Sequence, residues 1–183
     1  MRDTRQEILH FWFDETKPQQ WFQSSSDFDS LVRDRFMLTY DMARDGLCDG
    51  WQRDAQGCLA LCLVLDQFPR NMFRDDLRAF STDDKARSIA GYAISKGFDQ
   101  VLPPVRRRFV YLPYEHSEDI IHQRKAVALF ETMKKEDPLG YEYAVRHHNV
   151  IKKFGRFPHR NTILGRKNTP EEEEYLARPD AGF

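Results

Sequence analysis

Cysteine and long hydrophobic runs are both scarce in this sequence. The three cysteines are an odd number without a Cys-x-x-Cys spacing, which argues against a disulfide framework. The longest apolar run, Cys58 to Leu65, is far shorter than the ~20 residues that a membrane-spanning helix needs. Residues 1–6 carry charged side chains, and no apolar secretory segment follows them. We therefore expect a cytoplasmic protein with no membrane partner.

A dominant charge of one sign is also missing. The 28 lysines and arginines nearly balance the 29 aspartates and glutamates, so the formal net charge is -1. Because no overall field draws the chain onto nucleic acid, we expect no nucleic-acid partner. The only tight basic cluster is Arg106-Arg107-Arg108, which we interpret as a solvated helix face or as locally paired arginines.

Strand patterns are absent, and helical spacing takes their place. We find no alternating strand, no glycine-rich phosphate loop and no linker that could separate two domains. The composition, 40% hydrophobic and 31% charged, is that of a folded globular protein. The expected helices cover residues 4–13, 27–43, 54–68, 82–97, 103–113, 117–135, 137–154 and 169–177. We therefore predict an all-α protein, with a single domain over residues 1–183 built from seven to eight antiparallel helices.

Prolines and capping residues define the expected helix ends. Pro69 should stop the apolar helix that begins near residue 54, and Pro113 should close the helix that begins at residue 103. Thr82 and Ser117 precede two helices at positions where a hydroxyl can cap them. Gly155 is the expected C-terminal cap of the helix over residues 137–154.

Two polar stretches resemble each other and suggest a site. Residues 66–71 read Asp-Gln-Phe-Pro-Arg-Asn, and residues 154–161 read Phe-Gly-Arg-Phe-Pro-His-Arg-Asn. Both contain Phe-Pro followed by Arg-Asn, and the later copy has one extra residue, His159. We predict that the helices hold these stretches and the residues near His116 together beside a cavity that admits charged ligands.

The later stretch offers groups that recognise anions. Arg156 and Arg160 carry planar guanidinium forks suited to carboxylate or phosphate. His148 is expected on the helix face that leads to them, among the apolar positions of residues 137–154. In the alternative interpretation the two arginines neutralise carbonyls at helix ends and pair with Asp66 or Glu118.

His116 and Glu118 form a possible acid-base pair directly after a proline-containing segment. Histidine titrates near neutral pH, and a neighbouring carboxylate can tune it. The alternative is an ordinary helix start, in which Ser117 caps and Glu118 lies favourably on the helix dipole. Asp119 and His122 have the spacing of a helical metal motif, but only once, and we predict neither a metal site nor a cofactor.

Three ordered motifs make the chain similar to a known family. They are residues 65–71 (LDQFPRN), residues 111–118 (YLPYEHSE) and residues 154–166, which end in Leu-Gly-Arg. Over nearly its whole length the chain resembles the bacterial family known as domain of unknown function 924. The resemblance implies an all-helical fold of the tetratricopeptide-like kind, but no reaction, because the family has no established activity.

The same resemblance implies a set of functional positions. Those carried over by motif are Asp66, Gln67, Arg70, Asn71, His116, Ser117, Glu118, Arg156, His159, Arg160 and Asn161. The family usually has Leu-Pro-Phe-Met before His-Ser-Glu, whereas this chain has Leu-Pro-Tyr-Glu, which makes Glu115 a poor catalytic candidate.

Three hypotheses follow for these positions. In the first, they bind a small anionic ligand, with acid-base chemistry by His116, Glu118 or His159. In the second, the chain is a helical adaptor whose arginines clamp an acidic peptide or protein tail. In the third, the motifs are structural networks that lock helix ends together. The sequence leaves the reaction, the ligand and the oligomeric state open.

Overall fold

A computed structural model describes residues 4–179 and 181–182 of the chain. Every regular element within these residues is helical, which confirms the all-α prediction. Contacts between residues divide the chain into two compact units, residues 1–113 and residues 114–183, which we call the first and the second unit. The expectations of one domain and of a tetratricopeptide-like array stay predictions.

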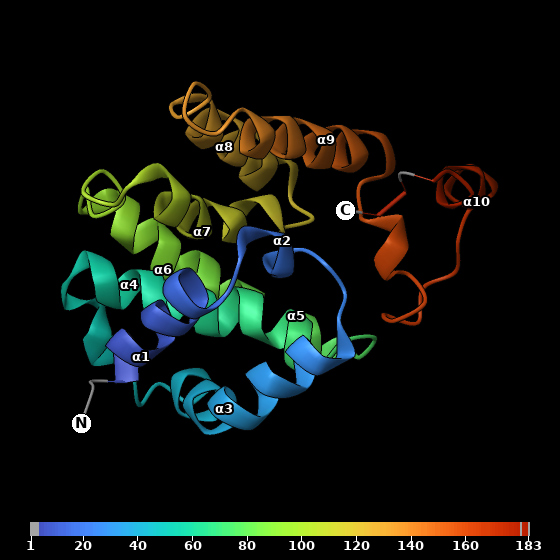
Figure 1. Cartoon of the computed structure of the whole chain (residues 1–183). Helices are drawn as coiled ribbons and strands as arrows, with labels where there is room; N and C mark the ends of the chain where they lie inside the picture. The colour runs from blue at the N-terminus through green and yellow to red at the C-terminus, as the bar shows by residue number, and fades with distance from the viewer. Residues whose placement is uncertain (1–3, 180, 183) are drawn as a thin grey trace. The chain divides into compact units, whose positions relative to one another are not determined.

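The elements follow each other in a simple order (Figure 1). The first unit contains α1 (Thr4–His10), α2 (Pro18–Trp21), α3 (Ser26–Arg44), α4 (Ala55–Cys62), α5 (Phe68–Met72) and α6 (Asp83–Ser95). It also holds most of α7 (Pro104–Glu115), whose last two residues belong to the second unit. The second unit continues with α8 (Ile120–Glu131), α9 (Pro138–Phe154) and α10 (Pro170–Leu176).

The core of the first unit is the continuous helical segment from α4 through α5. Residues 57–69 are all buried, which explains why this segment is apolar on nearly every side. Gly57 is required there, because a Cβ atom at this position would lie 1.8 Å from the carbonyl oxygen of Trp51. The rings of Trp12 and Phe36 pack against Phe68 with centroid distances of 5.6 and 4.9 Å. The abundant aromatic residues therefore fill the space between helices.

Pro69 does not end the apolar helix, contrary to the prediction. The helix passes through a π-helical turn, Leu63–Gln67, and continues as α5 with Pro69 in its first turn. A proline at position 69 removes the N–H that would bond the carbonyl of Leu65 four residues earlier. The hydroxyl of Thr82 donates a hydrogen bond to that carbonyl at 2.6 Å. Thr82 thus precedes α6 as expected, but its hydroxyl bonds the carbonyl of Leu65 and does not cap α6.

Two further predictions of helix ends in residues 103–135 are wrong. Pro113 lies inside α7, which continues to Glu115. The cap of α8 is Asp119, whose carboxylate accepts from the N–H of Ile121, and Ser117 is not the cap. The Ser117 hydroxyl instead lies 2.9 Å from Nδ1 of His122 and accepts from the N–H of Asp119.

The second unit is built on α8 and α9, which lie side by side (Figure 1). Asp137 caps α9, and Pro138 occupies its first turn. Gly155 ends the helix in the left-handed conformation with φ of 70°, as predicted. The buried positions of α9 are Gly140, Ala144, His147, Val150 and Ile151. The buried face therefore passes through His147, whereas the sequence analysis placed it one residue later, at His148.

Candidate functional site

The earlier polar stretch, residues 66–71, forms a closed network in the first unit. Arg70 donates from Nη1 and Nη2 to the two carboxylate oxygens of Asp83, at 3.0 and 3.1 Å. Its Nη1 also lies 3.3 Å from the carboxylate of Asp66, whose side chain is fully buried. The amide of Gln67 donates to the same Asp66 carboxylate. Arg70 therefore compensates two carboxylates of its own unit.

Asn71 belongs to a second network that joins α5 to α3. Its amide donates to Asp29 at 2.8 Å, and Arg74 donates to both oxygens of that carboxylate at 2.6 and 2.8 Å. Burial opposes ionisation of Asp29, but the hydrogen bonds from Arg74 and Asn71 lower its pKa. All four predicted residues of this stretch thus have protein partners in the first unit, as the structural-network hypothesis expects.

Glu118 ties the later stretch to the start of α8 in the second unit. Arg166 donates to both of its oxygens at 2.6 and 2.9 Å, and the N–H of Phe157 donates to it at 2.8 Å. Burial opposes ionisation, but the bonds from Arg166 and Phe157 lower the pKa of Glu118. Because Glu118 is held in its ionised form, it is better suited to position the loop that contains Phe157 and Arg166 than to exchange a proton with His116.

Arg156 and Asn161 hold the C-terminal helix of the second unit. Arg156 donates to both oxygens of Glu172 at 2.7 and 2.8 Å, and the amide of Asn161 donates to Glu172 at 3.3 Å. Glu172 forms a capping box with Thr169 at the start of α10. The bond from Arg156 is the main reason why the pKa of Glu172 falls to about 2. The expected pairing of Arg156 with Asp66 or Glu118 is therefore replaced by a pair with Glu172.

Two further predicted residues, Arg160 and His159, lie against one buried ring, Phe157. The guanidinium carbon of Arg160 lies 4.5 Å from the centre of this ring, and the ring of His159 lies 5.5 Å from it. From α9, the ring of His147 lies 5.5 Å from the Phe157 ring, measured between ring centres. The ring centre of His116 lies 6.3 Å from that of His147. We call these four residues, Arg160, His159, His147 and His116, the histidine cluster.

Burial and positive charge act on the histidines of this cluster in the same direction. Burial, and then the charge on Arg160, lower the pKa of His159 to about 4. Burial, followed by the charge on His116, lowers the pKa of His147 well below its ordinary value. Both imidazoles are therefore neutral at pH 7, and each can accept a proton or a hydrogen bond.

Two residues of this region were missed by the sequence analysis. Nδ1 of His147 donates to the carbonyl of Tyr143 at 2.8 Å, which leaves Nε2 as the acceptor of the neutral ring. The carboxylate of Glu115, 3% exposed, lies 3.2 Å from the same Nδ1. The spacing of the small residues Gly140 and Ala144 with Ile151 could have identified His147, because these positions share one helix face. The sequence analysis sets Glu115 aside, because Leu-Pro-Tyr-Glu departs from the usual family pattern.

The structure locates the predicted positions in two separate groups. Asp66, Gln67, Arg70 and Asn71 lie in the first unit. His116, Glu118, Arg156, His159, Arg160 and Asn161 lie in the second unit, and His148 lies there outside the histidine cluster. The predicted meeting of the two groups beside one cavity stays a prediction.

Cysteine chemistry and metal binding find no support in the residues that the structure describes. Cys48, Cys58 and Cys62 are buried and free, and burial raises the pKa of the Cys58 thiol to about 11. Within residues 4–179 and 181–182, no group of three or more histidine, cysteine or acidic side chains is placed to hold a metal ion. No helix in the same part of the chain is long and apolar enough to cross a membrane.

Comparisons with known proteins place the chain in a family. Residues 8–180 match the model of a family described as a bacterial protein of unknown function, DUF924. The chain belongs to this family. A solved structure of a protein of unknown function from Agrobacterium tumefaciens is 40% identical, with a TM-score of 0.89 over 95% of this chain and 97% of that one. No protein in the curated set matches this chain.

The family membership confirms the resemblance inferred from the three motifs. It brings a fold, supported by the similar Agrobacterium protein, and no activity. A function for this member of DUF924 therefore has to be argued from its own side chains.

Proposed function

We propose that the second unit binds a small oxyanion, a carboxylate or a phosphate, at the histidine cluster. The observation that supports this is the position of His147, His159 and Arg160 around Phe157, with His116 next to His147. The other predicted groups of this unit, Glu118 and Arg156, are engaged in carboxylate–arginine pairs. They position the loop that carries His159 and Arg160.

The electrostatics of the cluster favour a negative guest. The charge on Arg160 disfavours protonation of both His147 and His159, so the cluster resists a further positive charge. A bound anion would reverse this effect and raise the pKa of both imidazoles. Binding would then be accompanied by proton uptake, and it would tighten as the pH falls toward the pKa of the bound histidines.

The same groups could support acid-base chemistry on the bound anion. Neutral His159 would act as a general base or as a hydrogen-bond acceptor, and Nε2 of His147 has the same capacity. The sequence analysis names His116 and Glu118 as an acid-base pair. In the present proposal His116 contributes to the cluster and Glu118 acts by positioning Phe157.

The proposal is tested by NMR titration with sodium phosphate and sodium acetate, with chloride adjusted to keep the ionic strength constant. We expect saturable shifts of the imidazole signals of His116, His147 and His159, and a higher apparent pKa of His159 in the bound protein. Arg160→Gln should weaken binding about tenfold or more, because a charged hydrogen bond is lost.

A surface arginine provides the matched control. Arg78 pairs with Asp76 on the first unit, and its side chain is 62% exposed. Arg78→Gln should therefore leave the titration unchanged. If neither anion moves the three histidine signals, or if both variants bind equally well, the proposal is wrong.

An acidic peptide is the alternative ligand for the same groups, as in the adaptor hypothesis. A tetrapeptide that ends in two aspartates presents the carboxylate chemistry of acetate with additional contacts. We expect the small anions to compete with such a peptide if both use Arg160. Binding of the peptide with no binding of phosphate or acetate would favour the adaptor hypothesis.

A further inference from the structure

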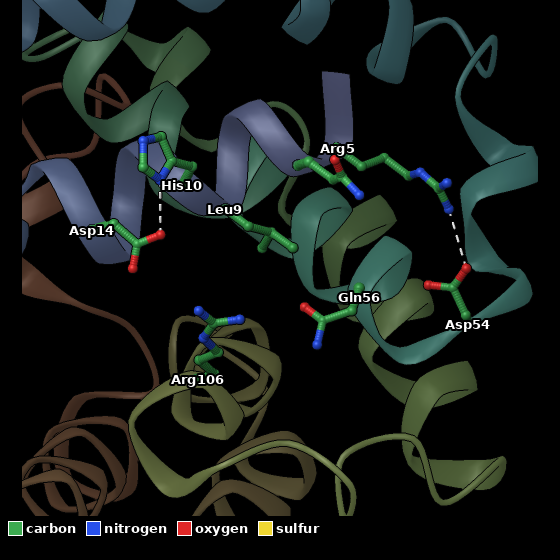
Figure 2. Close-up of a pocket in the computed structure, with 8 residues that line it drawn as sticks. Arg5, Leu9, His10, Asp14, Asp54, Gln56 and Arg106 are labelled. Atoms are coloured by element: carbon green, nitrogen blue, oxygen red, sulfur yellow. Dashed lines mark hydrogen bonds and ion pairs between the residues drawn. The ribbon is translucent and has the colours of Figure 1, made fainter. Parts of the chain in front are cut away.

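The first unit contains a hollow of about 440 Å³ that none of the predicted site residues lines. Figure 2 shows it below α1, with residues of α4 and α7 on the other sides. Its volume lies in the range of small-molecule binding sites. Its lining residues are Arg5, Gln6, Leu9, His10, Asp14, Asp54, Gln56 and Arg106.

Both carboxylates that line the hollow already have partners. Arg5 lies 3.1 Å from Asp54 at one end, and His10 lies 2.9 Å from Asp14 at the other, as the dashed lines in Figure 2 mark. The two pairs stand on opposite sides of the space between α1 and α7 (Figure 2). Each carboxylate of the lining therefore already has a partner within the hollow.

The remaining arginine of the lining is Arg106. Within residues 4–179 and 181–182, no carboxylate lies within 4.0 Å of its guanidinium. The guanidinium carbon instead lies 4.8 Å from the centre of the Phe13 ring. Stacking on a ring restrains the orientation of the guanidinium and leaves its N–H groups available to a ligand. Figure 2 shows the head of Arg106 pointing toward α1, into the hollow.

Arg107 and Arg108 follow Arg106 in the same basic run, but their contacts lie elsewhere. Arg107 donates to the backbone carbonyls of Leu102 and Gln100. Arg108 lies over the ring of Phe22, at 5.5 Å. Neither lines the hollow. Arg106 is thus distinguished from them by its place in a cavity that also offers the amide of Gln56 and the apolar side chain of Leu9.

We propose that this hollow binds a small carboxylate or phosphate anion, held by the guanidinium fork of Arg106. A carboxylate or phosphate matches this fork with two parallel hydrogen bonds. The amide of Gln56 supplies a further donor, and Leu9 contacts a short apolar group of the ligand. The site is independent of the histidine cluster, because all its residues belong to the first unit.

The test uses the full chain labelled with ¹⁵N, titrated with sodium phosphate and with sodium butyrate at constant ionic strength. Phosphate tests the fork alone, and butyrate adds a short apolar tail for Leu9. We expect saturable shifts of the backbone amides of Leu9, His10, Gln56 and Arg106. Arg106→Gln should weaken this binding about tenfold or more, and Arg106→Lys should keep only part of it, because a lysine has charge without a fork.

Arg87→Gln is the matched control, since Arg87 pairs with Asp84 in the same unit and does not line the hollow. It should bind both anions as the parent protein does. Arg160→Gln should also leave these amide shifts unchanged, which separates this site from the histidine cluster. Shifts that rise linearly without saturation, or that persist in Arg106→Gln, would overturn the proposal. Thermal unfolding without anion verifies that the Arg106 variants are folded.

Discussion

The two polar stretches, residues 66–71 and residues 154–161, share the letters Phe-Pro and Arg-Asn but differ in backbone. The first stays within one helical segment, with Pro69 in the first turn of α5. The second leaves the helix at once: Phe154 is the last residue of α9, Gly155 ends the helix, and Pro158 opens a short 3₁₀ turn. The same dipeptide therefore continues a helix in one place and begins an irregular loop in the other.

The partners of the two arginines differ as well. Arg70 lies between two carboxylates, Asp66 in its own helical segment and Asp83 at the start of α6. Arg160 lies on the Phe157 ring beside His159 and influences the titration of two histidines. What decides the role of each arginine is the set of side chains that other helices bring to it. The polar side chains of the first stretch pair with one another and with Asp83 and Asp29. The second stretch carries the residues that we propose for ligand binding.

The largest effect is expected from removing the arginine of the first stretch. Arg70→Met leaves Asp66, which is fully buried, and Asp83 without their cation. We expect a loss of about 3 kcal/mol in the free energy of unfolding, because breaking a buried ion pair leaves an uncompensated charge. Urea unfolding at pH 7, followed by circular dichroism, measures this loss.

Arg78→Met is the control for that measurement. It removes an exposed, solvent-screened pair with Asp76 and should leave the free energy of unfolding nearly unchanged. The contrast between the two stretches predicts that Arg160→Met costs less stability than Arg70→Met. Equal costs for Arg70 and Arg160 would contradict the division into a structural and a ligand-binding stretch.

Local patterns predicted much of the fold, since they depend on residues close in sequence. The helix expected over residues 27–43 corresponds to α3 (Ser26–Arg44). Gly155 correctly marked the end of α9, because a cap acts through adjacent backbone groups. The family motifs likewise identified residues that the structure engages in networks or in the histidine cluster.

Distant partners decided the features that sequence reasoning missed. Pro69 was expected to stop a helix because it lacks an N–H. The hydroxyl of Thr82, 13 residues after Pro69, instead donates to the carbonyl of Leu65, which that N–H would have bonded. The apolar spacing of residues 137–154 predicted His148 on the buried face, whereas the structure buries His147. His147 contacts Phe157 and lies beside the carboxylate of Glu115, and neither partner is visible in the periodicity of α9.

A smaller effect is expected from the titration of His159, a residue type that the first stretch lacks. Its pKa is about 4 in the folded protein against 6.5 for the ordinary side chain. Between these values the unfolded chain binds a proton that the folded protein does not. Stability must therefore fall as the pH drops from 6.5 toward 4, by about 2 kcal/mol for a half-buried imidazole.

Substitution isolates this contribution from that of the carboxylates. In His159→Asn, the loss of unfolding free energy between pH 7 and pH 4.5 should be about 2 kcal/mol smaller than in the parent protein. In Arg160→Gln, the loss of unfolding free energy between pH 7 and pH 4.5 should lie between those of the parent protein and His159→Asn. This substitution removes a cation that lowers the pKa of His159. Urea unfolding at the two pH values measures each slope, and a slope unchanged by His159→Asn would refute the assignment.

The smallest effect concerns the two Phe-Pro steps themselves. The step in the first stretch needs a donor from outside its helix, and the Thr82 hydroxyl supplies it to the carbonyl of Leu65. Thr82→Val should therefore cost about 1.5 kcal/mol of unfolding free energy, the value of a buried hydrogen bond. In a Pro69→Ala background the restored N–H can bond Leu65, so the same substitution should cost clearly less. Urea unfolding of the four proteins in this double-mutant cycle gives the coupling energy. A coupling near zero would mean that the carbonyl of Leu65 does not depend on Thr82, and that the proline is accommodated in the core helix by the π-helical turn alone.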